Sequence, residues 1–201
     1  MMQIDPVRRR LLQTMLSSLL ILSTSELEWI KNAMAGNWLP LPALPDVQLL
    51  DQDGRTLYLL SEILQGRLVM LNFIFTDCSS VCPSQTAILL EVLRQLRVQP
   101  STRDALMVSI TVDPVVDQPD RLRNYAKNFD LPVGLNNGWI LLTGAFENIA
   151  QVLTAFGIST ARPEAHSPLL WLGDTSRQRW VRTSALNPPP TIMQLIADIR
   201  R

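Results

Sequence analysis

The chain has 201 residues, enough for one domain and a short additional segment. Its 18 Lys and Arg residues balance 18 Asp and Glu residues, so its charge does not favour a nucleic-acid partner, and we expect none. Two cysteines and a single histidine exclude a disulfide-rich scaffold, a four-cysteine zinc site and a histidine-rich metal site.

Residues 1–35 predict an export signal or an N-terminal membrane tether. Three arginines at positions 8–10 precede an apolar run, residues 11–22, and this order is typical of secretory signals. The run is shorter than the roughly 20 residues that a membrane-spanning helix needs. The arginines also match the twin-arginine export pattern, and the alternative is an amphipathic helix that is never removed. We therefore expect a periplasmic or membrane-tethered protein on the export side of a membrane.

Residues 36–45 predict a linker, because the prolines at positions 40, 42 and 45 block helix formation and favour extended chain. One domain is expected over residues 46–201. Strands are predicted at 46–50, 55–60, 68–75, 106–112, 139–142, 169–172 and 179–182. Helices are predicted at 83–98, 117–129 with Asp117 as N-cap, 145–156 with Gly157 at its end, and 191–200. This order indicates an α/β, thioredoxin-like fold with a central mixed β-sheet, flanking helices and an N-terminal β-hairpin.

Cys78 and Cys82 stand where the apolar strand at 68–75 gives way to the first long helix. Ligands of α/β sheets bind beyond the carboxyl ends of strands, and a helix N-terminus lowers a thiol pKa below its usual value of about 8.5. At this spacing both sulfurs can face the same way and either hold one soft ion or form a disulfide. The residues alone leave open metal ligation, a redox dithiol, or inert buried cysteines.

His166 is the single imidazole of the chain and comes just before the strand predicted at 169–172. In a thioredoxin-like fold its loop ends near the edge of the sheet that carries the cysteines. Two thiolates and an imidazole suit copper, whereas zinc would need a fourth ligand. An ordinary surface or core histidine is the alternative that the residues alone leave open.

The segment Thr76–Pro83, with the letters TDCSSVCP, resembles the CxxxCP motif of the SCO/SenC family. Residues 45–54 are similar to the N-terminal hairpin of that family, and Thr111–Pro119 is similar to its DPxxDTP segment. His166 falls where the family has its histidine ligand. The resemblance covers about residues 44–200. It implies a thioredoxin-like domain that binds copper, as Cu(I) or Cu(II), through Cys78, Cys82 and His166.

Three departures from the family pattern concern the same region. Ser79 and Ser80 stand where many members have Pro-Asp, and Ala165 replaces a frequent Asp before the histidine. Pro168 occupies the position of the cis-proline of thioredoxin-like oxidoreductases, so we predict a cis peptide between Ser167 and Pro168. Asp113 and Asp117 also match the family pattern, and we assign them only structural roles, at a strand end and a helix N-cap.

The resemblance implies a copper-binding assembly factor, or metallochaperone, that delivers copper to the dinuclear copper site of cytochrome c oxidase. Its expected partners are the copper subunit of that oxidase, or another copper-receiving protein, and a protein that keeps its thiols reduced. The alternative is a thiol–disulfide oxidoreductase in which Cys78 and Cys82 are the catalytic dithiol. A peroxidase is less favoured, because no arginine is close in sequence to Cys78 and Arg162 is a distant candidate. A binding module without chemistry is disfavoured by the intact Cys, Cys, His set.

Overall fold

The computed structural model describes residues 38–158 and 167–201. The chain divides into two compact units, residues 1–38 and residues 39–201, and every element discussed below belongs to the second. The predicted export segment, residues 1–35, lies outside the described residues. No helix in the described part of the chain is long and apolar enough to cross a membrane.

A seven-stranded mixed sheet forms the centre of the domain, in the order β2-β1-β5-β4-β3-β6-β7. The three central strands β5, β4 and β3 are parallel, because helical crossovers return the chain to the same end of the sheet. Hairpins add antiparallel strands on both sides. The strands are β1 (Gln48–Asp51), β2 (Thr56–Tyr58), β3 (Leu68–Ile74), β4 (Leu106–Thr111), β5 (Trp139–Thr143), β6 (Leu169–Asp174) and β7 (Arg179–Ser184).

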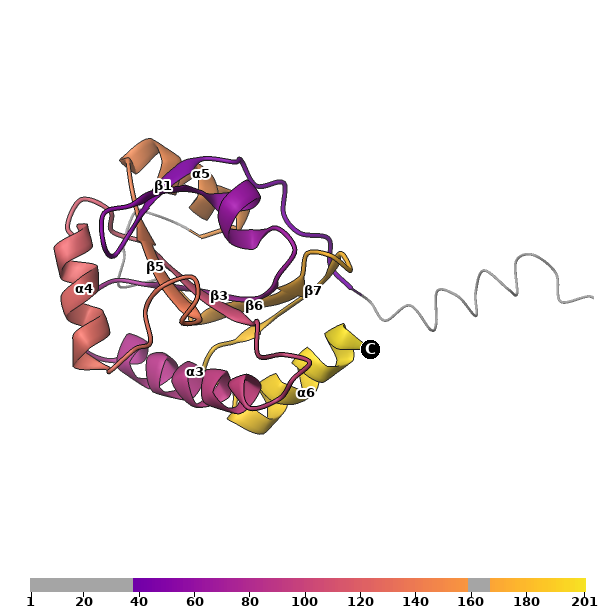
Figure 1. Cartoon of the computed structure of the whole chain (residues 1–201). Helices are drawn as coiled ribbons and strands as arrows, with labels where there is room; N and C mark the ends of the chain where they lie inside the picture. Colours follow the sequence, from indigo (N-terminus) through magenta and orange to yellow (C-terminus); the bar gives the residue numbers. More distant parts are fainter. Residues whose placement is uncertain (1–37, 159–166) are drawn as a thin grey trace, which may run out of the picture. The chain divides into compact units, whose positions relative to one another are not determined.

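Helices cover both faces of the sheet, which confirms the expected mixed α/β architecture. The α-helices are α3 (Val81–Arg97), α4 (Pro119–Asn128), α5 (Phe146–Ala155) and α6 (Pro189–Arg200). Figure 1 shows α3 and α6 lying together across one face, with α5 on the other. Every residue of β3 is buried, as expected of a continuous apolar strand between two helical layers.

A hydrophobic core lies between the sheet and α5. Alternate residues of β3, among them Leu71 and Phe73, face this core because side chains alternate along a strand. Phe156 at the end of α5 packs edge-on against Phe73 and against Trp171 of β6, with ring centroids 5.3 and 5.4 Å apart. The intervening residues of β3 face α3 and α6, so the strand that leads to the cysteines is held on both sides.

The second strand of the N-terminal hairpin is shorter than predicted. It ends at Tyr58, and a six-residue π-helical turn (η1, Leu59–Leu64) follows in place of the strand expected to reach position 60. The Asp46 carboxylate accepts hydrogen bonds from the N–H groups of Leu60 and Ser61, at 2.8 and 3.2 Å. This long-range cap provides partners for the start of the turn, which then buries Leu59, Ile63 and Leu64 in the core.

Candidate functional site

The two cysteines are positioned by the junction between β3 and α3. β3 ends at Ile74, the chain turns through a loop in which the Cys78 N–H donates to the Phe75 carbonyl at 3.3 Å, and α3 begins at Val81. Cys78 therefore lies in the loop and Cys82 in the first turn of the helix. Both thiols are free. The structure thus places both predicted cysteines at the carboxyl edge of the parallel strands.

The two thiols differ in exposure and acidity. Cys78 is half-buried, and its sulfur accepts a hydrogen bond from the Cys82 N–H at 3.3 Å, whereas Cys82 is 0% exposed. Partial burial acts to raise the pKa of Cys78, but hydrogen bonds from the N–H groups that open the helix outweigh it and lower the pKa. Burial raises the pKa of Cys82 to about 12. Cys78 is therefore the accessible and more acidic thiol.

A buried carboxyl group, that of Asp117, is hydrogen-bonded to the start of the cysteine loop. Asp117 is 1% exposed and accepts hydrogen bonds from the Thr76 N–H, at 3.1 and 3.2 Å to its two oxygens, and from the hydroxyls of Thr76 and Thr111. Burial raises the pKa of Asp117, although these hydrogen bonds oppose the shift. The expected N-cap role is wrong: Gln118 is the residue before α4, because Asp117 turns inward to join the ends of β3 and β4.

An arginine reaches the cysteine loop from α4. Arg121 forms an ion pair with Asp77 and donates from Nε to the Thr76 hydroxyl at 3.1 Å. Sequence proximity had suggested no arginine near Cys78, since position 121 is distant along the chain. Beside this ion pair lies a cavity of about 320 Å³, lined by Thr76, Asp77, Arg121, Asn124, Tyr125 and Asn128.

Tyr125 connects α4 to the helix that carries Cys82. Its hydroxyl lies 2.6 Å from the Thr86 hydroxyl and 3.5 Å from the Cys82 carbonyl oxygen, and burial raises its pKa. Figure 1 shows α4 beside the end of α3 at which that helix begins. Tyr125 and Arg121 are site residues that sequence reasoning missed. Their helical spacing of four placed them on one face of α4, but no local pattern indicated which element that face would contact.

His166, the third predicted copper ligand, lies outside the described residues. The chain just after it is described: β6 begins at Leu169 and runs antiparallel to β3, with Leu170 opposite Asn72. β6 therefore starts beside the half of β3 nearest the cysteines. Within residues 38–158 and 167–201, no three His, Cys, Asp or Glu side chains form a group that could hold a metal ion.

The predicted cis peptide is wrong, since the bond between Ser167 and Pro168 is trans. The Leu169 N–H donates to the Ser167 carbonyl at 2.7 Å. This hydrogen bond closes a three-residue turn around Pro168. The turn can close only if the Ser167 oxygen and the Pro168 Cα lie on the same side of the peptide bond, and that is the trans arrangement. The Pro168 carbonyl in turn accepts from the Ala185 N–H at 2.8 Å.

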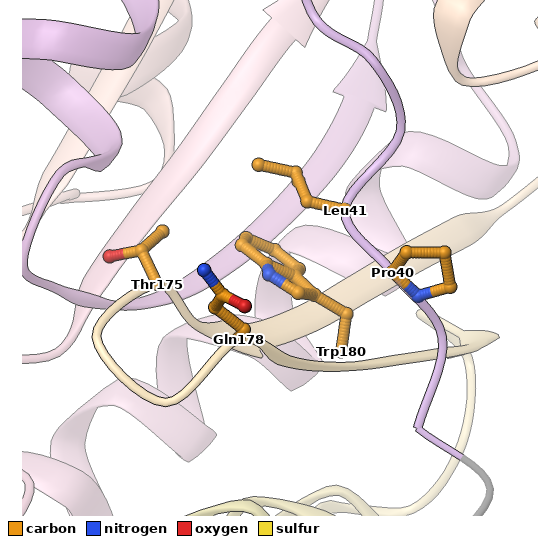
Figure 2. Close-up of a pocket in the computed structure, with 5 residues that line it drawn as sticks. All are labelled: Pro40, Leu41, Thr175, Gln178 and Trp180. Carbon is orange, nitrogen blue, oxygen red and sulfur yellow. The ribbon is translucent and has the colours of Figure 1, made fainter.

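A second cavity, of about 350 Å³, lies at the opposite edge of the sheet. Figure 2 shows the Trp180 ring between Leu41 and the side chains of Thr175 and Gln178. The strand register sets the position of this cavity. Asp174, which begins the turn between β6 and β7, pairs with Leu68, the first residue of β3. None of its lining residues is titratable or a strong metal donor, so it has no part in the thiol site.

A mixed sheet with covered faces, and two free thiols where a central strand meets its helix, define a thioredoxin-like protein with a CxxxC dithiol. Comparison with known proteins identifies the group within this class. A family model described as SCO1/SenC matches residues 42–199. The chain therefore belongs to the SCO1/SenC family.

Individual relatives agree with this assignment. The SCO1 protein homolog of Bacillus subtilis is 30% identical over 122 residues, which are 60% of this chain and 60% of the relative. A Stutzerimonas stutzeri protein named for copper binding is 33% identical over 157 residues, 73% of this chain and 72% of the relative. The aligned region thus spans less than two thirds of the Bacillus subtilis relative.

Solved structures confirm the thioredoxin-like fold. A SCO1/SenC family lipoprotein of Bacillus anthracis superposes with a TM-score of 0.66 at 24% identity, over 83% of this chain and 97% of the other. ScoI of Bradyrhizobium japonicum, solved with copper bound, superposes with a TM-score of 0.58 at 26% identity, over 82% of this chain and 98% of the other.

Proposed function

We propose that this protein is a copper-binding assembly factor. It binds copper through Cys78, Cys82 and His166 and delivers it to the dinuclear copper site of cytochrome c oxidase or to another copper-receiving protein. The observation that carries the proposal is the pair of free thiols at the carboxyl edge of β3, in a chain of a family with copper-bound members. Thiolates are soft ligands that select Cu(I), so the donor type fits the cargo.

The inequality of the thiols supports transfer by ligand exchange. Cys78 is the more accessible and more acidic sulfur, so it is the ligand that an incoming metal or an acceptor's thiol meets first. Cys82 is buried with a pKa of about 12, so copper must displace its proton, and binding weakens as the pH falls. Both thiols must be reduced to bind copper, and a thiol-reducing partner protein is therefore part of the proposal.

We also propose that the protein works on the export side of a membrane, in the periplasm or tethered by its N-terminus. The order of arginines and apolar residues in 1–35 supports this location, as does the membership of a lipoprotein in the same family. Fractionation of cells that express the full chain measures it directly. Recovery of the protein with the cytoplasmic fraction alone would contradict the assignment.

Copper titration of the reduced full chain tests the three ligands. The wild-type protein is expected to bind one copper ion, and Cys78→Ser, Cys82→Ser and His166→Ala should each weaken binding at least tenfold, since each removes one donor. Thr86→Ser, a conservative change near the site, provides the folded control. Unchanged affinity in His166→Ala would remove the histidine from the site, and no binding by the wild type would refute the function.

The unequal thiols also support a second function, thiol–disulfide exchange. The half-buried, more acidic Cys78 suits attack on a partner's disulfide, and the buried Cys82 suits resolution of the mixed disulfide that results. Its test is reduction of a model disulfide by metal-free protein. If His166→Ala leaves this exchange intact but abolishes maturation of the oxidase in cells, copper delivery is the biological role; if exchange and maturation fall together, the oxidoreductase function is favoured.

A further inference from the structure

The loop between β4 and α4 presents two adjacent valines to solvent beside the cysteine loop. Val115 is 72% exposed and Val116 is 37% exposed. They are the one pair of neighbouring positions at which large apolar side chains are exposed in the described part of the chain. Single exposed apolar residues are ordinary on protein surfaces, but two adjacent ones beside a reactive thiol indicate a surface that contacts a partner.

The parallel register brings the two loops together. Ile74 and Thr111, the last residues of β3 and β4, are paired, and the Val112 N–H donates to the Ile74 carbonyl at 2.8 Å. Asp117 then closes the valine loop onto Thr76, two residues before Cys78. The valine loop and the cysteine loop are therefore neighbours at the same edge of the sheet.

The valine loop is held rigidly by its own hydrogen bonds. The Asp117 N–H donates to the Asp113 carbonyl at 2.8 Å, and the Gln118 side-chain amide donates to the Pro114 carbonyl at 2.7 Å. Turns of this kind usually carry Gly, Asn, Asp or Ser, while β-branched valine prefers strands. The valines thus oppose the local preference and contribute little to the core, a conflict that is expected at a functional surface.

We propose that Val115 and Val116 are a docking surface for the polypeptide that receives the metal, and that this polypeptide carries aliphatic or aromatic side chains next to its acceptor cysteine. The inference rests on the proposed function and names the chemistry of its partner. Charge contributes little, because the neighbouring Arg121 is already paired with Asp77. A membrane is a poorer occupant, since two valines flanked by Asp113 and Asp117 lack the basic residues and broad apolar face of a lipid-binding element.

Thiol exchange with peptides of defined sequence tests the surface without metal. The probe is a hexapeptide with one cysteine flanked by leucines, its sulfur joined to thionitrobenzoate, and the comparison probe has serines in place of the leucines. The Cys78 thiolate attacks the peptide sulfur, the old disulfide breaks and thionitrobenzoate leaves with its electron pair. Its release gives the rate. No other oxidant is required.

The wild-type protein should react about tenfold faster with the leucine peptide than with the serine peptide, because aliphatic side chains are buried against the valines. V115S/V116S should lose this preference, to within about twofold. V115T/V116T keeps the branched side-chain shape but replaces a methyl group with a hydroxyl at each position, and it should also lose the preference for the leucine peptide. Loosening of the loop by the serine substitutions would then not explain the loss. V98S is the matched control, since Val98 is 81% exposed just after the far end of α3, and it should keep the full preference.

Three further readings separate the possible causes. Alkylation by neutral iodoacetamide should proceed at the same rate in all variants, which shows that the acidity of Cys78 is intact. V115S/V116S should bind copper as the wild type does. Failure of the wild type to bind copper would refute the proposed function, while the docking surface would still be decided by the peptide preference. A preference for the leucine peptide that persists in V115S/V116S would overturn the inference. So would a different occupant of the valines: a dimer of the wild type, or binding of the wild type to vesicles, that V115S/V116S abolishes.

Discussion

Cys78 and Cys82 are separated by only three residues, yet they are chemically different groups. The difference comes from the point at which α3 begins. N–H groups of the first helical turn have no partner within the helix, and some of them point to the Cys78 sulfur in the preceding loop. Cys82 already belongs to the helix and faces the interior, where an ionised thiol loses its hydration.

The alkylation rates of the two thiols should therefore depend differently on pH. In Cys82→Ser, Cys78 should react with iodoacetamide with an apparent pKa below that of a cysteine in an unstructured peptide, because the Cys82 backbone N–H remains in place. In Cys78→Ser, Cys82 should be almost unreactive near neutral pH, since burial, the largest cause of its raised pKa, remains. Equal pH profiles in the two variants would show that the helix start does not distinguish them.

Asp117 should make the free energy of unfolding depend on pH. Its pKa is raised above the ordinary 3.8 in the folded state, so between 3.8 and the raised value the folded protein holds more protons than the unfolded chain. Stability from this group is therefore greatest at low pH and falls as the pH rises through that window. Denaturant unfolding at a series of pH values should show this slope in the wild type and a flatter profile in Asp117→Asn.

Asp117→Asn should in addition lower the free energy of unfolding by about 1–3 kcal/mol near neutral pH, because an amide cannot accept all the bonds from Thr76 and Thr111. Asp120→Asn is the control, as that carboxylate lies three residues further on, exposed in the first turn of α4. A loss of equal size in both variants would mean that the buried position of Asp117 is not the cause.

At the scale of the strands, a buried polar row crosses the face of the sheet that α3 and α6 cover. Ser109 of β4 donates to the Asn72 side-chain oxygen at 2.7 Å, and the Trp139 indole N–H donates to the Ser109 hydroxyl at 3.0 Å. Asn72 and Ser109 are directly paired between β3 and β4. Because a shift of register by one residue would separate these groups and bury them without partners, the row favours the observed alignment.

Ser109→Ala should lower the free energy of unfolding by about 1–3 kcal/mol, because the Trp139 N–H and the Asn72 oxygen both lose their partner in a buried setting. Equilibrium denaturation measures the change. Thr143→Val on β5 is the matched control: the Thr143 hydroxyl is buried without a hydrogen-bond partner, so replacing it with a methyl group should be neutral or stabilising. The proposed importance of the polar row fails if the two substitutions have the same effect.

At the scale of the whole domain, Trp180 joins parts of the chain that are far apart in sequence. It is buried on β7, its carbonyl accepts from the Leu39 N–H at 2.8 Å, and its ring lies over Gly173 of β6. The proline-containing segment after Leu39 thus packs along the sheet edge, with Leu41 against the hydrophobic core and Leu44 within it. Figure 2 shows Leu41 next to the Trp180 ring, among the residues that line the cavity at this edge.

Gly173→Ala should destabilise the domain by about 1–3 kcal/mol, since the added methyl carbon would overlap the Trp180 ring. Thermal unfolding should show a lower Tm. Gly144→Ala is the matched control, because its methyl carbon would meet Leu49 at 3.3 Å, a distance that a small adjustment relieves. Copper affinity per folded molecule should remain unchanged in Gly173→Ala, as Gly173 lies toward the edge of the sheet remote from the cysteines.

The elements and their order followed from local chemistry. The apolar run at 68–75, the helical spacing after Cys82 and the turn at 51–54 each reflect interactions among near neighbours, so they could be inferred without a structure. The same holds for the cysteine pair, because its place between a strand and a helix is a local property. His166 was a candidate from its position before a strand, the family resemblance made it the expected ligand, and it stays a prediction because it lies outside the described residues.

Tertiary structure alone decided the properties that depend on distant neighbours. Asp117 looks like a helix cap in sequence, but Thr76 and Thr111 turn it into a buried acceptor. Arg121 reaches Asp77 because α4 packs beside the start of α3. Burial and long-range hydrogen bonds depend on which elements pack against one another, and the residues near a position in the sequence do not determine that packing.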